Sequence, residues 1–358
     1  MIRIGVRTDG NAEIATGHLR RCLTVADALT DRAEVVFYVS DEESAALLRQ
    51  FSSRFPVYIT GTDYRAPKEN AADYARPELP ELLLVDSYSL TEEWLRFLSG
   101  LAPVCYLDDL MLFDYPAALV VNYDPAPPSA FYRSAEQLLA GPQYAPLRPE
   151  FAAAGAAYHV REIVRDVLIT TGGTDPLDIT GRLAEALAAG FGKNTDRRLS
   201  GGALSAPLCI HMVSGARNIH RSRLMALAER FPSLCFHENV EDMAALMASC
   251  DLAVTAAGTT LCELCAVGVP AVSFCMADNQ KTQAAAFDRL GAVPCCTGLP
   301  EILHWIHTAA APGSLDARRA QSARMRTVTD GRGASRIADA LLCTAARGRR
   351  LPDRTDIP

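Results

Sequence analysis

The stretch Arg7–Arg21 has the sequence R-T-D-G-N-A-E-I-A-T-G-H-L-R-R and joins a predicted strand to a predicted helix. Ile2–Val6, directly before it, is apolar enough for a buried strand. Such a junction places the positive end of a helix at the carboxyl edge of a parallel sheet, where open α/β folds bind ligands. The helix is predicted to start near Gly17 or His18, because apolar residues then recur at helical spacing. These residues are Leu19, Cys22, Leu23, Ala26 and Leu29.

His18 is the candidate general base of this stretch. In a first helical turn the positive end of the helix dipole favours the neutral imidazole, which can accept a proton near pH 7. Asp9, Arg20 and Arg21 lie close by in the sequence and bring the charges that active sites use. The alternative interpretation is a histidine that only satisfies neighbouring backbone groups, and its position alone does not decide between the two.

Length and composition predict two α/β domains in series. The chain has 358 residues, which is long for one core, and 49% of them are apolar. A net charge of -7 argues against a nucleic-acid partner. No apolar run approaches the length of a membrane span, so we expect no stable membrane insertion and a cytoplasmic location. We also expect a monomer.

The cysteines indicate thiols rather than a metal centre. Eleven cysteines are scattered mostly through apolar segments, as in proteins of a reducing compartment. Cys262 and Cys265 form a C-x-x-C motif, and Cys295-Cys296 follows later, so zinc has to be weighed. Because the first pair lies inside a helical pattern, whereas zinc ribbons place C-x-x-C on a turn, we expect no metal and no cofactor.

Polar residues follow several predicted strands of the first half. Aspartate and asparagine are common after strands, so a single one requires no function. Their repetition, together with Asp9, predicts that the carboxyl edge of this sheet lines a cleft. The residues that follow Leu82–Val85, Val104–Leu107 and Ala118–Val121 are Asp86, Ser87, Tyr88, Asp108, Asp109 and Asn122.

A break in the pattern divides the chain into two halves. Residues 141–159 are rich in proline and alanine, which is typical of a domain boundary. We predict two Rossmann-like domains that face a central cleft, an N-terminal one over 1–145 and a C-terminal one over 146–358. Arg318–Arg326 and Ala334–Thr344 are predicted to close the second domain as helices.

The second half contains a candidate anion-binding turn. The predicted strand Leu252–Thr255 leads into A-A-G-T-T-L-C-E, which ends at Glu263. Backbone N–H groups and the hydroxyls of Thr259 and Thr260 can hold a diphosphate at a helix start. One turn later, Glu263 can accept hydrogen bonds from a ribose. Simple N-capping by the threonines, with Glu263 in a capping box, is the alternative.

Several spaced motifs together resemble known families. G-T-T-L-C-E at 258–263, with D-N-Q at 278–280, resembles the donor-nucleotide region of two-domain glycosyltransferases of the B type. The N-terminal motif resembles the signature of the UDP-2,4-diacetamido-2,4,6-trideoxy-β-L-altropyranose hydrolases of pseudaminic acid biosynthesis and of their spore-coat polysaccharide relatives. The likeness continues at Asp86, Tyr88, Asp108, Asp109, Asn122, Gly141, Tyr144, Arg148, Glu150, Phe151 and Gly172-Gly173-Thr174-Asp175.

The resemblance implies a glycosyltransferase-B-like fold and a small-molecule UDP-sugar substrate. The implied reaction is hydrolysis of a UDP-linked 2,4-diacetamido-2,4,6-trideoxyhexose at its anomeric carbon, with inversion and without a metal, and His18 takes the place of the base. The implied substrate-binding residues are Asp9, Gly17, Arg21, Tyr88, Gly173, Thr259, Thr260, Glu263, Asn279 and Gln280.

Two alternatives to the hydrolase remain. One is a glycosyltransferase of the B type that passes the sugar of a UDP-amino-sugar donor to an acceptor, and the other is a non-catalytic nucleotide-sugar-binding protein. The chain departs from the family's pattern at Ile14-Ala15-Thr16, where I-G-x is usual, and at Ser87, where histidine is frequent. A different diacetamido sugar would account for both departures.

Overall fold

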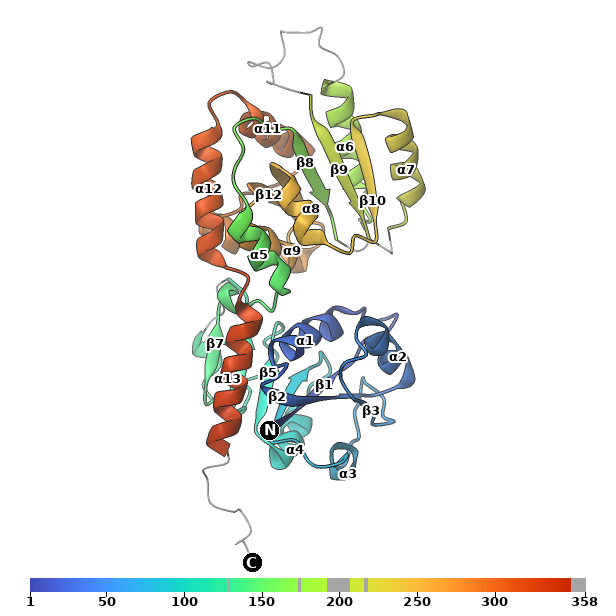
Figure 1. Ribbon diagram of the computed structural model, residues 1–358, viewed down its shortest axis with the longest axis vertical. Coiled ribbons are helices and arrows are strands. Elements are labelled where there is room, and N and C mark those ends of the chain that lie inside the picture. The colour runs from blue at the N-terminus through green and yellow to red at the C-terminus, as the bar shows by residue number, and fades with distance from the viewer. Residues whose placement is uncertain (126, 128, 173–174, 192–206, 216–217, 349–358) are drawn as a thin grey trace, which may run out of the picture. The chain divides into compact units, whose positions relative to one another are not determined.

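The computed structural model describes residues 1–358 except 126, 128, 173–174, 192–206, 216–217 and 349–358. The chain forms two compact units. The first unit holds Met1–Arg148 and the segment from Arg332 onward, and the second holds Pro149–Gly331. Each unit consists of one parallel sheet with helices packed on it, as Figure 1 shows.

The first unit is built on a seven-stranded sheet with the order β3-β2-β1-β4-β5-β6-β7. All of its strand pairs are parallel, and the order grows outward from β1 on both sides, which is the doubly wound Rossmann arrangement. The strands are β1 (Ile2–Thr8), β2 (Ala33–Val39), β3 (Val57–Ile59), β4 (Leu82–Asp86), β5 (Val104–Leu107), β6 (Leu119–Asn122) and β7 (Leu138–Ala140). The helices are α1 (Gly17–Ala28), α2 (Glu42–Phe51), α3 (Ala71–Tyr74), α4 (Glu92–Leu101) and α13 (Gly333–Gly348), with short 3-10 helices η1 (Ser129–Phe131) and η2 (Pro142–Tyr144).

Strand β4 is a continuous apolar run over Leu82–Val85 because helices cover both faces of the sheet. In β4, Leu82 and Leu84 pack into the core that contains residues of α1, α2 and α13. Leu83 and Val85 point the other way, into the core that contains residues of α4. Side chains alternate across a strand, so a strand buried on both sides needs a continuous apolar run.

The second unit repeats this arrangement with a six-stranded sheet in the order β10-β9-β8-β11-β12-β13. Its strands are β8 (Asp166–Thr170), β9 (Cys209–Ser214), β10 (Leu234–Glu238), β11 (Leu252–Ala256), β12 (Ala271–Phe274) and β13 (Cys295–Cys296). Its helices are α5 (Pro149–Ala157), α6 (Ile179–Phe191), α7 (Arg221–Arg230), α8 (Met243–Ser249), α9 (Thr260–Val267), α10 (Lys281–Arg289), α11 (Leu299–Ala310) and α12 (Leu315–Val328), with the 3-10 helix η3 (Asp278–Gln280). The predicted α/β class with two Rossmann-like sheets is confirmed.

The last helix corrects the predicted domain boundaries. The prediction placed 146–358 in one domain, whereas α13 packs with the first unit, against α1. Ile337 and Leu341 of α13 are fully buried in the same core as α1. Gly333 permits the close approach at the start of α13, since an added Cβ would collide with the carbonyl oxygen of Ala145. The sequence shows an amphipathic helix but does not specify which core it completes.

The predicted linker at 141–159 contains a helix of the second unit. Helix α5 (Pro149–Ala157) packs on α8 and α9. Gly155 allows this contact because a Cβ there would collide with the carbonyl oxygen of Ala266 in α9. The alanine-rich composition therefore reflects close helix packing, and the division between the units falls between Arg148 and Pro149.

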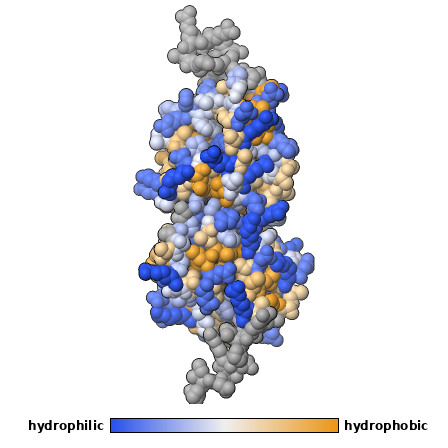
Figure 2. All heavy atoms as spheres, turned by 90° about the vertical axis from the view of Figure 1, so that its left-hand side faces the viewer, coloured by the Kyte–Doolittle hydropathy of each residue, from blue (hydrophilic) through white to orange (hydrophobic). Residues whose placement is uncertain are grey.

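The surface carries hydrophilic and apolar side chains side by side. Figure 2 shows them interspersed over one face of each unit. Within the part of the chain that the structure describes, no helix is both long and apolar enough to cross a membrane.

Candidate functional site

His18 lies in the first turn of α1, at the carboxyl edge of the first sheet. Its side chain is 5% exposed, and its Nδ1 lies 2.7 Å from Oδ1 of Asp86, the last residue of β4. Strands β1 and β4 are neighbours in the sheet, which brings the β1–α1 turn beside the end of β4. The topology thus explains how residues far apart in sequence form this pair.

Asp86 is ionised although it is completely buried. Burial alone would raise the pKa of this carboxyl group, but the Arg21 guanidinium and His18 hold the pKa well below its usual range. Arg21 binds it bidentately, with Nε 2.5 Å from Oδ2 and Nη2 2.5 Å from Oδ1. Arg21 therefore neutralises Asp86, and the pair stays charged inside the protein.

The charge of Asp86 determines which nitrogen of His18 is basic. A carboxylate can only accept hydrogen bonds, so Nδ1 of His18 must carry a proton and donate it to Asp86. Nη2 of Arg21 also lies 3.1 Å from this Nδ1, but a guanidinium donates only, and its donors bind Asp86. Nε2 is consequently the lone-pair nitrogen of the neutral ring, as a general base requires.

A small pocket surrounds this pair. It is lined by Asp9, Ile14, His18, Tyr64, Asp86, Ser87, Tyr88 and Ser89. Tyr88 is half-exposed and packs edge-on against the His18 ring, with 4.2 Å between the ring centroids. Burial and Asp109 raise the pKa of Tyr88 to about 12, so its hydroxyl is a neutral donor at physiological pH. The structure thus brings the predicted residues Asp9, His18 and Tyr88 to one pocket.

Arg21 and Tyr88 converge on Asp109, which follows β5. Nη1 of Arg21 lies 2.9 Å and the hydroxyl of Tyr88 3.1 Å from the same oxygen, Oδ2 of Asp109. Arg21 also donates to the hydroxyl of Tyr123 at 2.5 Å. The other oxygen of Asp109, Oδ1, is buried and lacks a hydrogen-bond partner within the described chain.

Asp9 is held by the protein itself. Its Oδ2 pairs with Nη1 of Arg7 at 2.5 Å, and its Oδ1 accepts from the backbone N–H of Ser40 at 2.6 Å. Arg7 is fully buried and also binds Glu69 at 2.8 Å. Asp9 therefore anchors the β1–α1 loop as part of a buried charge network, and its predicted contact with substrate is left as a prediction.

Gly17 begins α1 in an exposed position, and a Cβ added there would meet no atom within 4 Å. Packing therefore does not require glycine at this position. Two positions earlier, Ala15 adopts a φ of 61°, in the left-handed region that favours glycine. The structure thus gives a physical reason for the glycine that the resembling family has in place of Ala15.

In the second unit, the predicted anion-binding turn lies between β11 and α9. Thr259 is the N-cap residue and Thr260 the first helical residue, and the N-cap side chain makes no capping hydrogen bond. Gly258 is open, since an added Cβ would meet no atom within 4 Å. Glu263 lies in the first turn of α9, half-buried. The capping alternative for Thr259 is therefore wrong.

A neighbouring helix of the same unit starts differently. Asp175 precedes α6, and its two carboxylate oxygens accept from the backbone N–H groups of Ile179 at 2.8 Å and Thr180 at 2.9 Å. This helix start is thus already occupied by a carboxylate of the protein. Unlike α6, helix α9 has a start at which no side chain of the cap residue occupies the backbone N–H groups.

The structure describes the side chain of Gln280 but not Gly173 or the side chain of Asn279, the other predicted substrate-binding residues of the second unit. Oε1 of Gln280 accepts from the backbone N–H of Met276 at 2.8 Å, so it helps to shape the turn after β12. Gly173 and the side chain of Asn279 lie outside the described residues. Both are left as predictions.

Sequence reasoning missed the residues that only the three-dimensional network assigns. Arg7, Ser40 and Glu69 fix Asp9, and Tyr123 contacts Arg21. Ser40 and Tyr123 directly follow the strands β2 and β6, so the strand-end rule could have found them. Glu69 lies in an irregular segment before α3, where no sequence pattern points to it.

Comparisons with known proteins give two distant sequence relatives. The spore coat polysaccharide biosynthesis protein SpsG of Bacillus subtilis (strain 168) is 23% identical over 304 residues, which cover 81% of this chain and 82% of that protein. The uncharacterized protein MJ1062 of Methanocaldococcus jannaschii is 24% identical over 304 residues, covering 76% of this chain and 55% of that protein. The chain thus spans about half the length of the second relative. No protein-family profile matches the chain.

Solved structures resemble the whole chain. MurG of Acinetobacter baumannii superimposes with a TM-score of 0.66 at 17% identity and covers 96% of this chain and 100% of that one. The glycosyltransferase VinC in complex with dTDP gives a TM-score of 0.60 at 14% identity, covering 97% and 100%. The fold is of the glycosyltransferase-B type. The Streptomyces sp. SF2575 glycosyltransferase SsfS6, complexed with thymidine diphosphate, also has this fold, with a TM-score of 0.56, 17% identity and coverage of 96% and 100%.

Proposed function

We propose that this protein cleaves the bond between the sugar and the diphosphate of a UDP-sugar, with His18 as the general base. The observation that carries the proposal is the His18–Asp86 pair, in which an ionised, buried carboxylate accepts the Nδ1 proton at 2.7 Å. This contact leaves Nε2 of His18 to take a proton from an attacking oxygen. Such a positioned base contributes about 10²–10⁴ in rate.

The proposed reaction needs few other groups. The attacking oxygen forms a bond to the anomeric carbon as its proton passes to Nε2 of His18, and the bond to the β-phosphate oxygen breaks with both electrons leaving on UDP. Attack opposite to the departing diphosphate gives inversion. The uncapped start of α9, with Gly258, Thr259 and Thr260, offers backbone N–H groups and hydroxyls for the diphosphate charge.

The first candidate acceptor is a hydroxyl group of a second molecule, which would make the protein a glycosyltransferase. VinC and SsfS6 are glycosyltransferases whose structures hold dTDP and thymidine diphosphate.

The second candidate acceptor is water, which would make the protein a hydrolase. The Arg7–Arg21 motif favours it through its resemblance to the UDP-diacetamido-trideoxyhexose hydrolases, and so does the similarity to SpsG, a spore coat polysaccharide biosynthesis protein. The same base would then activate a water molecule, and the free sugar would be released.

A UDP-release assay tests the proposal. The full-length protein is mixed with UDP-linked amino sugars, including diacetamido-trideoxyhexose donors, with and without candidate acceptors, and UDP and the anomeric sugar signal are followed. UDP with inverted free sugar in the absence of acceptor supports hydrolysis, whereas UDP only with acceptor supports transfer.

A pair of histidine variants serves as the control. His18→Ala should lose about 10²–10⁴ in turnover, whereas His304→Ala, which changes an exposed histidine of α11, should retain it. A folded His18→Ala protein with full turnover would refute the role of the base. Donor binding with no UDP release under any condition would instead identify a nucleotide-sugar-binding protein.

A further inference from the structure

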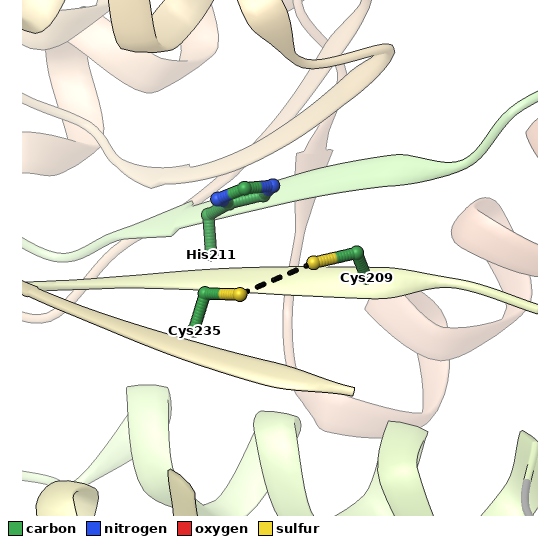
Figure 3. Close-up of side chains that lie close together, drawn as sticks. All are labelled: Cys209, His211 and Cys235. Atoms are coloured by element: carbon green, nitrogen blue, oxygen red, sulfur yellow. Dashed lines mark hydrogen bonds between the residues drawn. The ribbon is translucent and has the colours of Figure 1, made fainter. Parts of the chain in front are cut away.

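Three metal-ligating side chains meet on the second sheet, away from the helix starts discussed above. Cys209 and His211 lie two residues apart on β9, so they point to the same face. Cys235 of the adjacent parallel strand β10 pairs in register with His211 and shares that face. Figure 3 shows the sulfur atoms of Cys209 and Cys235 pointing toward each other, with the side chain of His211 beside them.

The geometry of this group fits a metal ion. One ligand atom from each residue lies within 4.8 Å of the other two, and the two Sγ atoms are 3.3 Å apart. In a tetrahedral zinc site with Zn–S bonds of about 2.3 Å, the sulfur atoms are about 3.8 Å apart. A small shift of half-buried side chains reaches this spacing, and within the described chain no other group of three such residues meets the same criterion.

The neighbours of His211 complete the arrangement that metal-bound histidines use. Nε2 of His211 lies 2.9 Å from Oδ1 of Asp166, the first residue of β8. A carboxylate that accepts the Nε2 proton orients the ring and leaves Nδ1 for the metal. Nε2 of His237 lies 3.0 Å from this Nδ1, so a second imidazole stands next to the site.

A disulfide between the two cysteines fits less well. Cys235 pairs with His211, so Cys209 lies two residues along the strand from the position opposite Cys235. With strands about 4.8 Å apart and a rise of about 3.3 Å per residue, the Cα atoms are then about 8 Å apart. Disulfides rarely span more than about 7 Å between Cα atoms.

We propose that Cys209, His211 and Cys235 bind one Zn²⁺ ion, with Asp166 orienting His211 and the fourth position open to an external ligand such as water. Two thiolates and imidazole are ligands that zinc prefers. Strand β10 is the edge of its sheet and pairs only with β9, so the ion would fasten this edge strand. This replaces our expectation of no metal from the sequence, and it does not depend on the proposed UDP-sugar reaction.

Metal content and cobalt substitution test the site in the full-length protein under reducing conditions. We expect about one zinc per chain after purification. After removal of zinc with a chelator, added Co²⁺ should give a thiolate-to-cobalt charge-transfer band and the visible bands of a tetrahedral ion. Zinc added back to the stripped protein should raise the melting temperature by roughly 5–10 °C.

Cysteine variants locate the site. Cys209→Ser and Cys235→Ser should each abolish the charge-transfer band, whereas Cys296→Ser, which changes another half-buried cysteine of the second unit, should retain it. His211→Ala should weaken metal affinity and alter the visible bands while the thiolate band persists. Three outcomes would overturn the proposal: no band in the reduced wild-type protein, a band that survives both substitutions, or oxidation of the pair to a disulfide with no metal uptake after reduction.

Discussion

The two sheets share one strand order over six strands, but the side chains at their carboxyl edges differ in charge and in exposure. In the first unit, His18, Arg21 and Asp86 form a buried network in which each charge already has a partner. In the second unit, Gly258 and Thr259 at the start of α9 are uncharged and open. One topology thus carries a histidine whose protonated nitrogen is set by Asp86 in the first unit, and in the second unit a helix start that we propose as an anion site.

The largest effect is expected from changing the partner of the base. Asp86→Asn should lower turnover about 10²–10⁴-fold, because an amide no longer enforces the Nδ1–H form of His18. Asp108→Asn is the matched control. Asp108 is also buried after a strand, but it binds the hydroxyls of Tyr115 and Tyr132, so this change should affect stability and leave turnover near wild type. Equal turnover in the two variants would contradict the assignment.

The next largest effect tests the buried charges for stability. Asp9→Asn should lower the free energy of unfolding by about 1.5–3 kcal/mol, because Arg7 would lose one of its two buried carboxylate partners and keep Glu69. Glu13→Gln, which changes an exposed partner of Arg65, should cost less than about 1 kcal/mol. Urea unfolding of both variants measures the difference. Similar losses would mean that burial does not distinguish the two pairs.

At the open start of α9 in the second unit, substitutions should change ligand affinity and not stability. Thr259→Val and Thr260→Val should weaken UDP binding about tenfold, through the loss of a hydrogen bond to a charged phosphate, and leave the melting temperature unchanged. Asp175→Ala should instead cost about 1 kcal/mol of stability, as the loss of a helix cap, without a change in UDP affinity. Calorimetric titration and thermal melts distinguish the two, and unchanged UDP affinity in both threonine variants would reject the anion site.

A smaller effect is expected from Asp124, near the charges of the first unit. Burial, together with Asp109 and Asp108, raises its pKa to about 6, above the unfolded value of about 3.9. Its ionisation therefore opposes folding, and the resulting loss of stability develops as pH rises from about 4 to about 6. Asp124→Asn should gain about 1 kcal/mol at pH 8, because water screens part of the repulsion, and nothing below pH 4.

The control for Asp124 is Asp114, whose shift has the opposite sign. Hydrogen bonds from Ser134 lower the pKa of Asp114, so its ionised form favours folding and its contribution is lost as pH falls. Asp114→Asn should therefore lose stability at pH 8. Unfolding titrations at both pH values check the two signs, and a gain for both variants would contradict the account.

The smallest effect is expected at the loop before His18. Ala15→Gly should stabilise the protein by about 0.5–1 kcal/mol, because glycine adopts the observed φ of 61° without strain. Ala12→Gly in the same loop lacks this strain relief and should be neutral or destabilising. Chemical unfolding compares the two, and destabilisation by Ala15→Gly would show that no strain is stored there.

The sequence predicted the features that depend on local pattern. The strands, the helix start near His18 and the turn at Thr259 follow from apolar periodicity and small residues, and the structure has them. The rule that strand-end polar residues gather at one edge was correct for Asp86. Asp108, in contrast, binds tyrosines and backbone of its own unit, so the turn-former interpretation was better there.

The remaining features depend on contacts between distant segments. Arg7 and Glu69 are 62 residues apart, and the sequence around neither residue predicts a buried ion pair. Cys209 and Cys235 looked like scattered thiols until the β9–β10 register placed them together. The sequence likewise could not predict which of the two units α13 packs on, because an amphipathic helix fits any apolar surface of suitable shape.

The return of α13 to the first unit has a consequence for biosynthesis. A ribosome completes Pro149–Gly331 before it makes Ile337 and Leu341, which fill the core of the first unit. The second unit can therefore fold while the first still exposes the apolar patch that α13 will cover. During that interval the nascent chain presents a site for chaperones, and premature termination before α13 would leave an aggregation-prone product even though its second unit is complete.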